Sequence, residues 1–257
     1  MSKQNFRIGQ IVPSSNVTME TEIPALLRAR EQVESERFTF HSARMRMKNV
    51  TREELEAMDA ESDRCALELS DAAVDVMGYA CLVAIMSMGK GYHRESERRL
   101  SEVARDNGHA CPVVSSAGAL VEGIKVLGAK RISVLAPYMK PLTRLVTDYI
   151  ESEGIEVIDV ISLEIANNLE VAAQDPLKPA EICKKLDVRG ADAVVVSACV
   201  QMPSLPAIGP VEQHFGLPAV SASVCTTYQM LNRLGLKTAA PGGGTLLSGE
   251  YGAAQAA

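Results

Sequence analysis

The chain contains the same pattern of strands and helices twice. Three segments of the first half match three segments of the second half in the same order: IGQIVPSSN (8–16) with ISVLAPYMK (132–140), VDVMGYAC (74–81) with DAVVVSAC (192–199), and CPVVSSAGALVEGIKVLG (111–128) with LPAVSASVCTTYQMLNRLG (217–235). The connections between the matched segments are shorter in the second half. One such match could arise by chance, but three in the same order indicate a duplicated unit.

Each copy alternates short apolar runs with amphipathic helical stretches, which is typical of a parallel sheet with helices on both faces. The predicted strands are 7–12, 38–43, 73–80 and 112–115 in the first copy, and 131–136, 155–161, 191–198 and 218–221 in the second. The predicted helices include 53–73, 95–107, 117–127, 141–153 and 179–186. We therefore predict an α/β fold with two pseudo-symmetric, doubly wound parallel-sheet domains that face a central cleft.

The repeat also predicts where the two domains divide. The segment from Pro218 onward should return beside the first half, because it matches the segment that begins at Pro112. We predict a discontinuous first domain, residues 1–116 plus 222–257, and a second domain, residues 117–221. A chain of 257 residues is long enough to bury a substantial core in this arrangement.

Composition excludes several classes of partner. A net charge of −6 with 4% aromatic residues makes nucleic-acid binding improbable, since phosphate contacts need clustered lysine and arginine. The longest uncharged stretches, 193–211 and 213–232, contain several prolines or polar side chains and do not predict a membrane span. Six cysteines without a visible signal peptide favour the cytoplasm and free thiols.

Spacing gives no support for a metal ion or an organic cofactor. The six cysteines form no CxxC pair and the four histidines are scattered along the chain, so a zinc site is not expected. The segment GKG (89–91) lacks the third glycine of a dinucleotide loop, and no GxxxxGK[ST] motif is present. We therefore predict a function that needs no cofactor.

Polar or nucleophilic side chains follow the predicted strands. In parallel sheets, ligands bind beyond the carboxyl ends of the strands, and two units that face each other would place these ends on one shared cleft. The candidate site residues at strand ends are Ser14, Ser15, Asn16, Cys81, Ser115, Ser116, Tyr138, Cys199 and Ser221. Ser14 and Ser115 are the weaker candidates, because serines at such positions often cap the next helix.

Two cysteines occupy matched positions in the repeat. Cys81 and Cys199 each end a near-continuous apolar run, as expected for strands buried on both faces. Without the repeat, burial would be the simpler interpretation of each thiol. With it, the two thiols are expected on opposite sides of one cleft. The contexts of the other four favour packing in the core: Cys65, Cys111, Cys183 and Cys225.

A pair of thiols that faces one small substrate suits a stereochemical change at carbon. A thiolate is both a nucleophile and a base, and backbone N–H groups at a strand end are expected to lower the thiol pKa. One thiol would attack or deprotonate the substrate, and the other would supply a proton. Backbone N–H groups with Asn or Ser side chains would hold carboxylate oxygens.

The paired cysteines of a duplicated α/β chain resemble the aspartate/glutamate racemase superfamily, which includes hydantoin racemases and arylmalonate decarboxylases. Within it, the chain most resembles the maleate isomerases. The segments that carry the resemblance are IGQIVPSSNVTMETEIP (8–24), GYACLVAIMSMG (78–89), VLAPYMKPL (134–142), ANNLEVAAQDP (166–176) and SACVQMPSL (197–205). The cysteine pair marks only the superfamily, whereas PSSNVTMETE, NNLEVAAQDP and CVQMPSL together are far more specific.

This resemblance implies the cis-trans isomerisation of maleate to fumarate, without a cofactor, through a covalent succinyl-cysteine. It implies that Cys81 is the nucleophile and that Cys199 is the proton donor. It also implies a homodimer and a set of substrate-binding residues, with side chains from Asn16, Tyr138 and Asn168 and backbone groups from Leu82, Val83, Val200 and Gln201. Spacing alone does not separate Asn168 from Asn167; the resemblance selects Asn168.

The duplicated fold with its cleft is also compatible with two other functions. A two-cysteine amino-acid or hydantoin racemase would only remove and return a proton, and a non-catalytic protein that binds small acids would not need the thiols at all. A dicarboxylate substrate would normally invite an arginine. Arg44 and Arg46, at the end of the second predicted strand, could approach the cleft but are expected to be surface residues.

Overall fold

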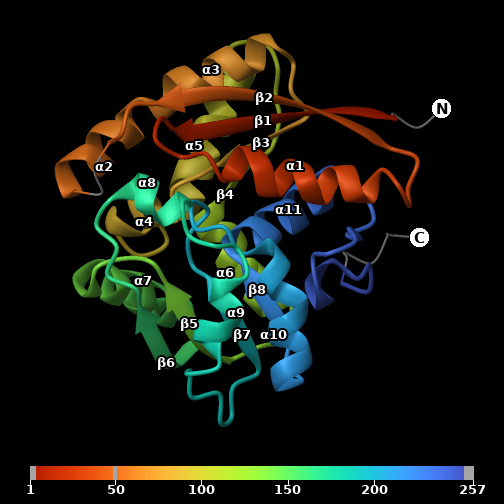
Figure 1. The fold of residues 1–257 in the computed structure, drawn as a ribbon. Helices are drawn as coiled ribbons and strands as arrows, with labels where there is room; N and C mark the ends of the chain where they lie inside the picture. The colour runs from red at the N-terminus through yellow and green to blue at the C-terminus, as the bar shows by residue number, and fades with distance from the viewer. Residues whose placement is uncertain (1–3, 49–50, 252–257) are drawn as a thin grey trace.

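The computed structural model describes residues 4–48 and 51–251 and contains two parallel sheets of four strands each (Figure 1). The first sheet has the order β2-β1-β3-β4 and the second has the order β6-β5-β7-β8. The strands of the first sheet are β1 (Asn5–Pro13), β2 (Arg37–Met45), β3 (Val76–Tyr79) and β4 (Val113–Ser115). Those of the second are β5 (Arg131–Ala136), β6 (Glu156–Ser162), β7 (Ala193–Ser197) and β8 (Ala219–Ser221).

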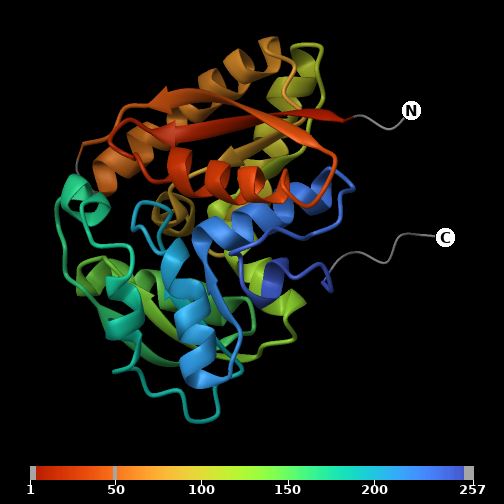
Figure 2. The ribbon, with the colours of Figure 1, turned by 45° about the vertical axis from the view of Figure 1, so that its right-hand side comes forward.

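The helices cover both sheets and fill the space between them (Figure 2). Six helices precede β5 in the chain: α1 (Met19–Arg30), α2 (Arg52–Ala60), α3 (Ser62–Asp71), α4 (Leu82–Ser87), α5 (Tyr92–Asp106) and α6 (Ser116–Val126). Five follow: α7 (Lys140–Ser152), α8 (Asn168–Ala172), α9 (Lys178–Cys183), α10 (Ile208–Phe215) and α11 (Ala222–Arg233). Two 3₁₀ turns are η1 (Leu205–Ala207) and η2 (Thr245–Leu247). Within the described residues, no helix is long and apolar enough to cross a membrane.

The identical strand order confirms the predicted α/β fold with two parallel sheets. Each central strand is apolar and completely buried in the segments that were matched as a repeat, for example Val76–Tyr79 and Ala193–Ser197. Such strands have no solvent-facing side and therefore show no alternation of polar residues. The exact domain boundaries stay a prediction, although α11 packs against α1 and β3 of the first sheet.

One predicted helix is wrong. The sequence predicts a single helix over 53–73, but the structure has two, α2 and α3, separated at Glu61. The Ser62 hydroxyl donates to the Asp59 carbonyl oxygen at 2.6 Å, and such local bonds compete with the regular helical ladder. The Asp59 carboxylate accepts from the Tyr79 and Tyr92 hydroxyl groups at 2.9 and 2.8 Å, which fixes α2 to β3 and α5.

Candidate active site

The two matched cysteines line one small cavity between the carboxyl ends of the two sheets. Its volume is about 20 Å³, which leaves room for one or two water molecules. The eleven described lining residues all lie at strand ends or in the segments after them, and none of them carries a charge: Pro13, Asn16, Met47, Cys81, Leu82, Val83, Tyr138, Asn168, Cys199, Val200 and Gln201. The nine residues that the resemblance implied as catalytic or substrate-binding are all among them.

Cys81 lies at a sharp change of backbone direction. Strand β3 ends at Tyr79, the Ala80 N–H donates to the Ile11 carbonyl oxygen at 2.9 Å, and α4 begins at Leu82. Between them Cys81 has φ 84° and ψ 69°, a left-handed conformation. This conformation is unfavourable for a residue with a Cβ, and it persists where the surrounding structure enforces it, often at active sites.

The space behind this turn is closed by two helices. A Cβ atom on Gly78 would clash with the side chains of Met230 from α11 and Met19 from α1. Glycine at this position, three residues before Cys81, therefore allows both helices to pack directly against β3. Burial of β3 on both faces explains why its sequence shows no alternation of polar residues before the thiol.

Burial raises the pKa of the Cys81 thiol to about 12, and the nearby Cys199 and Asp59 add to this effect, whereas the Ala84 N–H opposes it. The sequence predicted a lowered thiol pKa, since backbone N–H groups at the strand end were expected to stabilise the thiolate more than burial destabilises it. The prediction is wrong because desolvation of the thiolate outweighs the single N–H group. In the free site, Cys81 is therefore a neutral thiol at neutral pH.

This raised pKa predicts how fast Cys81 reacts with an alkylating agent. Because only the thiolate reacts, modification of Cys81 by iodoacetamide should accelerate about tenfold per pH unit through neutral and mildly alkaline pH, with no plateau below pH about 12. Peptide mass spectrometry at a series of pH values measures this rate. Cys65, which is 0% exposed, serves as the unreactive control. A plateau near neutral pH would show that the thiol pKa is lowered instead.

Cys199 has more hydrogen-bond donors around its sulfur than Cys81. The Gln201 N–H donates to Cys199 Sγ at 3.4 Å. Burial raises the pKa of Cys199, and the Tyr138 hydroxyl and the N–H groups of Gln201 and Met202, all hydrogen-bonded to the sulfur, oppose that effect. The side chain is 7% exposed. These donors suit a sulfur that gives up a proton during a reaction and takes it back.

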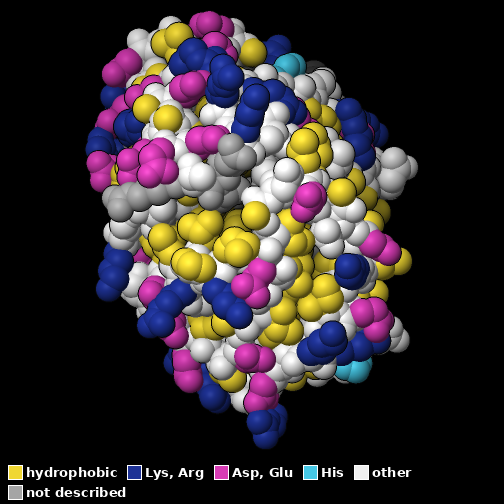
Figure 3. All heavy atoms as spheres, turned by 60° about the vertical axis from the view of Figure 1, so that its left-hand side comes forward, with side chains coloured by type: hydrophobic (Ala, Val, Ile, Leu, Met, Phe, Trp, Pro, Cys, Tyr) yellow, Lys and Arg dark blue, Asp and Glu magenta, His cyan; other side chains and the backbone are white. Residues whose placement is uncertain are grey.

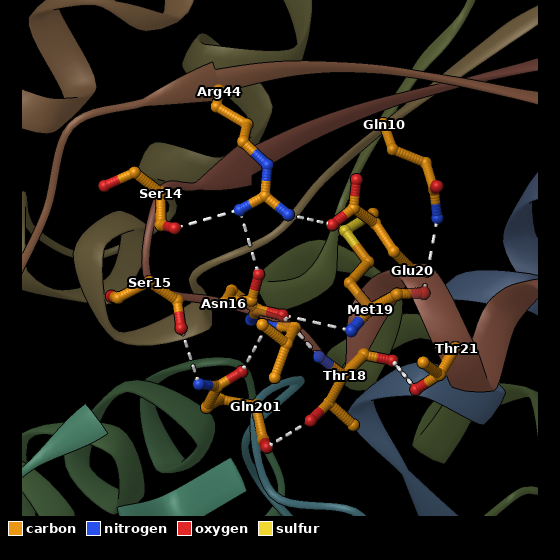
Figure 4. Close-up of polar contacts among 11 residues, drawn as sticks. Gln10, Ser14, Ser15, Asn16, Thr18, Met19, Glu20, Thr21, Arg44 and Gln201 are labelled. Carbon is orange, nitrogen blue, oxygen red and sulfur yellow. Dashed lines mark hydrogen bonds and ion pairs between the residues drawn. The ribbon is translucent and has the colours of Figure 1, made fainter. Parts of the chain in front are cut away.

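Asn16 presents its amide nitrogen to the cavity. Its Oδ1 accepts from the N–H groups of Thr18 and Met19, both at 3.0 Å, which fixes the side chain at the start of α1 (Figure 4). In the part of the chain that the structure describes, Asn16 Nδ2 has no hydrogen-bond partner, and the residue is 3% exposed. An amide nitrogen held in this way is a neutral donor for a carboxylate oxygen.

The structure separates Asn167 from Asn168. Asn167 Oδ1 accepts from Leu169 N at 2.8 Å and Glu170 N at 3.2 Å, so Asn167 caps α8. Asn168 lines the cavity and its Nδ2 donates to Ser15 Oγ at 2.7 Å. Of these two asparagines, Asn168 is therefore the one that lines the cavity, and its role in substrate binding stays a prediction.

Gln201 connects the two halves of the molecule through its side chain. Nε2 donates to the carbonyl oxygens of Ser15 and Asn168, both at 2.9 Å, and Oε1 accepts from Val17 N at 3.0 Å. Thr18 Oγ1 also donates to the Gln201 carbonyl oxygen at 2.7 Å (Figure 4). The resemblance implied only a backbone role for Gln201; its side chain fixes the segment after Cys199 to the segment that holds Asn16.

Replacing Gln201 by alanine should destabilise the protein by about 3 kcal/mol, because three hydrogen bonds of this buried side chain, two of them between the halves, are lost at roughly 1 kcal/mol each. Urea unfolding measures the change. Gln174→Ala is the matched control, since the Gln174 side chain makes one exposed bond to Glu170 within its own segment and should change stability by less than about 0.5 kcal/mol. Equal effects of the two substitutions would contradict the role of Gln201 as a connection.

Ser14 and Ser115, the weaker candidates, do not line the cavity. Ser14 Oγ donates to the Met47 carbonyl oxygen at 3.1 Å and accepts from Met47 N at 3.0 Å. Ser115 Oγ caps α6 by accepting from Gly118 N at 3.0 Å, as strand-end serines often do. Both serines hold the chain near the site without facing it.

Arg44 is a residue whose contribution the sequence did not predict. Its Nη1 donates to the carbonyl oxygens of Ser14 at 2.9 Å and Asn16 at 3.2 Å, and its Nη2 pairs with Glu20 (Figure 4). The expectation of a plain surface residue is therefore incomplete, because this arginine orients the backbone that carries Asn16. Met47, another lining residue, was also missed, since an apolar residue in a loop gives no distinctive signal.

The remaining thiols belong to the core. All six cysteines are free, and the four outside the cavity are buried: Cys65, Cys111, Cys183 and Cys225. Among the residues that the structure describes, no group of three or more His, Cys, Asp or Glu side chains could hold a metal ion.

Comparison with known proteins agrees with this geometry. The arylmalonate decarboxylase family model matches residues 8–247. A maleate isomerase of Geobacillus stearothermophilus is 62% identical over 96% of this chain and 99% of its own length. The crystal structure of a maleate isomerase from Pseudomonas putida S16 with maleate, a cysteine-to-alanine mutant, is 64% identical with a TM-score of 0.95, over 96% of this chain and 99% of that chain.

A second solved structure concerns the covalent chemistry. The maleate cis-trans isomerase of Nocardia farcinica, as a cysteine-to-serine mutant with a covalently bound succinylcysteine intermediate, is 46% identical with a TM-score of 0.91, over 95% of this chain and 98% of that chain. The resemblance read from the sequence motifs is thus confirmed at the level of whole chains. From its fold, its paired cysteines and these relatives, the chain belongs to the maleate isomerase family.

Proposed function

We propose that this protein isomerises maleate to fumarate without a cofactor, with Cys81 as the nucleophile and Cys199 as the proton donor. The observation that carries the proposal is the pair of thiols that line one uncharged cavity from equivalent strand ends of the two sheets. Relatives named as maleate isomerases, one solved with maleate and one with a succinylcysteine, support this choice of substrate and intermediate.

The reaction proceeds by addition, rotation and elimination. The thiolate form of Cys81, which its raised pKa keeps to a small fraction of the free enzyme, forms a C–S bond to one alkene carbon, the electron pair of the double bond moves to the neighbouring carbon, and Cys199 delivers a proton there. The remaining C–C single bond then rotates. Cys199 Sγ takes the proton back, the double bond re-forms, and the C–S bond breaks to return the Cys81 thiolate. Atoms and charge balance over the cycle.

Neutral donors hold the substrate carboxylates in this proposal. Asn16 Nδ2 and the amide of Asn168 face the cavity, and the backbone at Leu82 and Val83 lines it. A cationic pocket would bind the ground-state dianion as strongly as the transition state and would not accelerate the reaction. Neutral dipoles that point to where charge develops on the carboxylate stabilise the addition step instead.

A direct assay tests the proposed function. The purified protein should convert maleate to fumarate in buffer without added cofactor, as followed by proton NMR of the two vinyl signals. The same samples with amino acids or hydantoins in deuterated water should show no exchange of the α-proton. Exchange at an α-carbon without loss of maleate would support a racemase in its place, and binding of maleate without turnover would support a binding protein.

A homodimer in the cytoplasm completes the proposal. Apolar side chains gather on the face that carries α4, α7, α8 and β6 (Figure 3), where Met88, Met139, Val160 and Leu169 are 38–59% exposed. Exposed apolar surface of this kind often marks a subunit interface. Sedimentation equilibrium measures the oligomeric state, and a monomer at every concentration would contradict the proposed dimer.

A further inference from the structure

Glu22 is a buried carboxylate that is not part of the cavity wall. It lies in the first turn of α1 and is 6% exposed. Its Oε1 accepts two backbone hydrogen bonds, from Ser204 N at 2.5 Å and from Leu205 N at 2.7 Å. Bonds from N–H groups to a carboxylate are among the stronger hydrogen bonds in proteins. Glu22 therefore fixes the segment 204–205 of one half to a helix of the other half.

The segment that Glu22 holds begins at Cys199. Residues 200–205 follow the thiol directly, and the early N–H groups of this segment, those of Gln201 and Met202, donate to the Cys199 sulfur. The late N–H groups, those of Ser204 and Leu205, donate to the carboxylate. One short loop thus has the sulfur at its beginning and Glu22 at its end, and Glu22 holds its later part while the Gln201 side chain and Thr18 hold its earlier part.

The surroundings of Glu22 are costly for stability. Glu22 Oε2, Ser204 Oγ and Ser223 Oγ are buried and have no hydrogen-bond partner among the described residues. Burial also raises the pKa of Glu22, against the effect of the two backbone bonds and of the neighbouring Ser223 side chain, which lower it. A buried acid with unsatisfied neighbours is not an arrangement that maximises stability, and such arrangements persist mainly where function requires them.

We propose that Glu22 is a positioning residue for Cys199. Its carboxylate anchors the loop 200–205 so that the N–H groups of Gln201 and Met202 stay on the Cys199 sulfur while this thiol gives up its proton and takes it back. The inference rests on the proposed function, in which Cys199 is the proton donor. The titratable groups that face the sulfur are Tyr138 after β5, Cys81 after β3, and Glu22 on α1.

Two substitutions separate anchoring from charge. Glu22→Gln keeps a carbonyl oxygen that can accept both backbone N–H groups, and it should retain kcat within about fivefold. Glu22→Ala removes the anchor, and it should lower kcat about 100-fold with a small change in KM, because misplacement of a reacting group by about 1 Å costs on this order. Thr21→Val is the control on the same helix, since the Thr21 hydroxyl bonds only to the Thr18 carbonyl oxygen and not to the loop.

A second measurement does not depend on turnover. In a Cys81→Ala background, iodoacetamide reports the thiolate of Cys199 as a function of pH. Glu22→Gln should move this profile to lower pH, because the negative charge of Glu22 raises the pKa of Cys199 and the substitution removes that charge. Glu22→Ala removes the charge and the anchor together, so its profile should lie at higher pH than that of Glu22→Gln because the sulfur also loses donors. Thr21→Val should leave the profile unchanged. If wild-type protein fails to isomerise maleate, the proposed function falls but this profile still tests the anchor. An unchanged kcat in Glu22→Ala, coincident profiles of Glu22→Gln and Glu22→Ala, or equal losses of kcat in the two, would overturn the proposal.

Discussion

Replacing Cys81 by alanine should lower the rate of maleate isomerisation by roughly a thousandfold or more, because no other group at this position can form the bond to carbon. Initial rates with saturating maleate measure the loss. The substitution should leave the fold intact, since a small residue replaces a partly exposed one. Circular dichroism and the unfolding midpoint verify that the variant is folded.

The matched control is Cys183→Ala. Cys183 is completely buried in α9 and lies outside the cavity wall, so its loss should reduce stability by about 1 kcal/mol and leave the rate unchanged. If Cys81→Ala retained more than a tenth of the activity, the covalent route through Cys81 would be wrong. Loss of activity in both variants would indicate a general effect of removing thiols rather than a nucleophile.

Replacing Cys199 by serine should have an equally large effect by a different route. The addition of Cys81 to maleate remains possible, because the basic carbanion at the neighbouring carbon can take a proton from solvent water. The reverse step is blocked, because the serine hydroxyl, with its much higher pKa, does not provide the base that removes this proton again. The adduct should therefore accumulate. Intact-protein mass spectrometry should show an increase equal to one maleic acid, and peptide mapping should locate it on Cys81.

The double variant Cys81→Ala with Cys199→Ser is the control for this experiment and should carry no adduct. A Cys199→Ser protein that turns over at the wild-type rate would assign the proton transfer to another group, with Tyr138 as the nearest alternative because its hydroxyl bonds to the same sulfur. An adduct on the introduced serine would reverse the proposed roles, and an adduct on any cysteine other than Cys81 would contradict Cys81 as the nucleophile. Both experiments use the same preparation and can share one unmodified reference.

The sequence was sufficient to predict the parts of the site that follow from periodicity and repetition. Buried parallel strands are apolar throughout, so their ends are easy to recognise, and the repeat paired Cys81 with Cys199. Contacts between distant segments give no such signal. Nothing in the residues near Gln201 or Glu22 indicates that their side chains bond to backbone 180 residues away, since a glutamine or glutamate is compatible with many surroundings.

Backbone strain and the balance of electrostatic effects were also beyond sequence reasoning. A non-glycine residue gives no sign that it will adopt a positive φ, as Cys81 does. The direction of the thiol pKa depends on how completely the packed helices exclude water from the sulfur, and this is a property of the whole fold. The break between α2 and α3 has a similar origin, because it depends on Asp59 meeting tyrosines from two other elements.

The polar connections between the β1–α1 segment and the segment after Cys199 have a consequence for how the molecule melts. Thr18, Glu22 and Gln201 tie the halves together beside the cavity, and α11 packs against both α1 and α6. Neither sheet can lose its structure while the other keeps its own packing. Calorimetry should therefore record one heat-absorption peak, with equal calorimetric and van't Hoff enthalpies, despite the ancestry of the chain as two joined units.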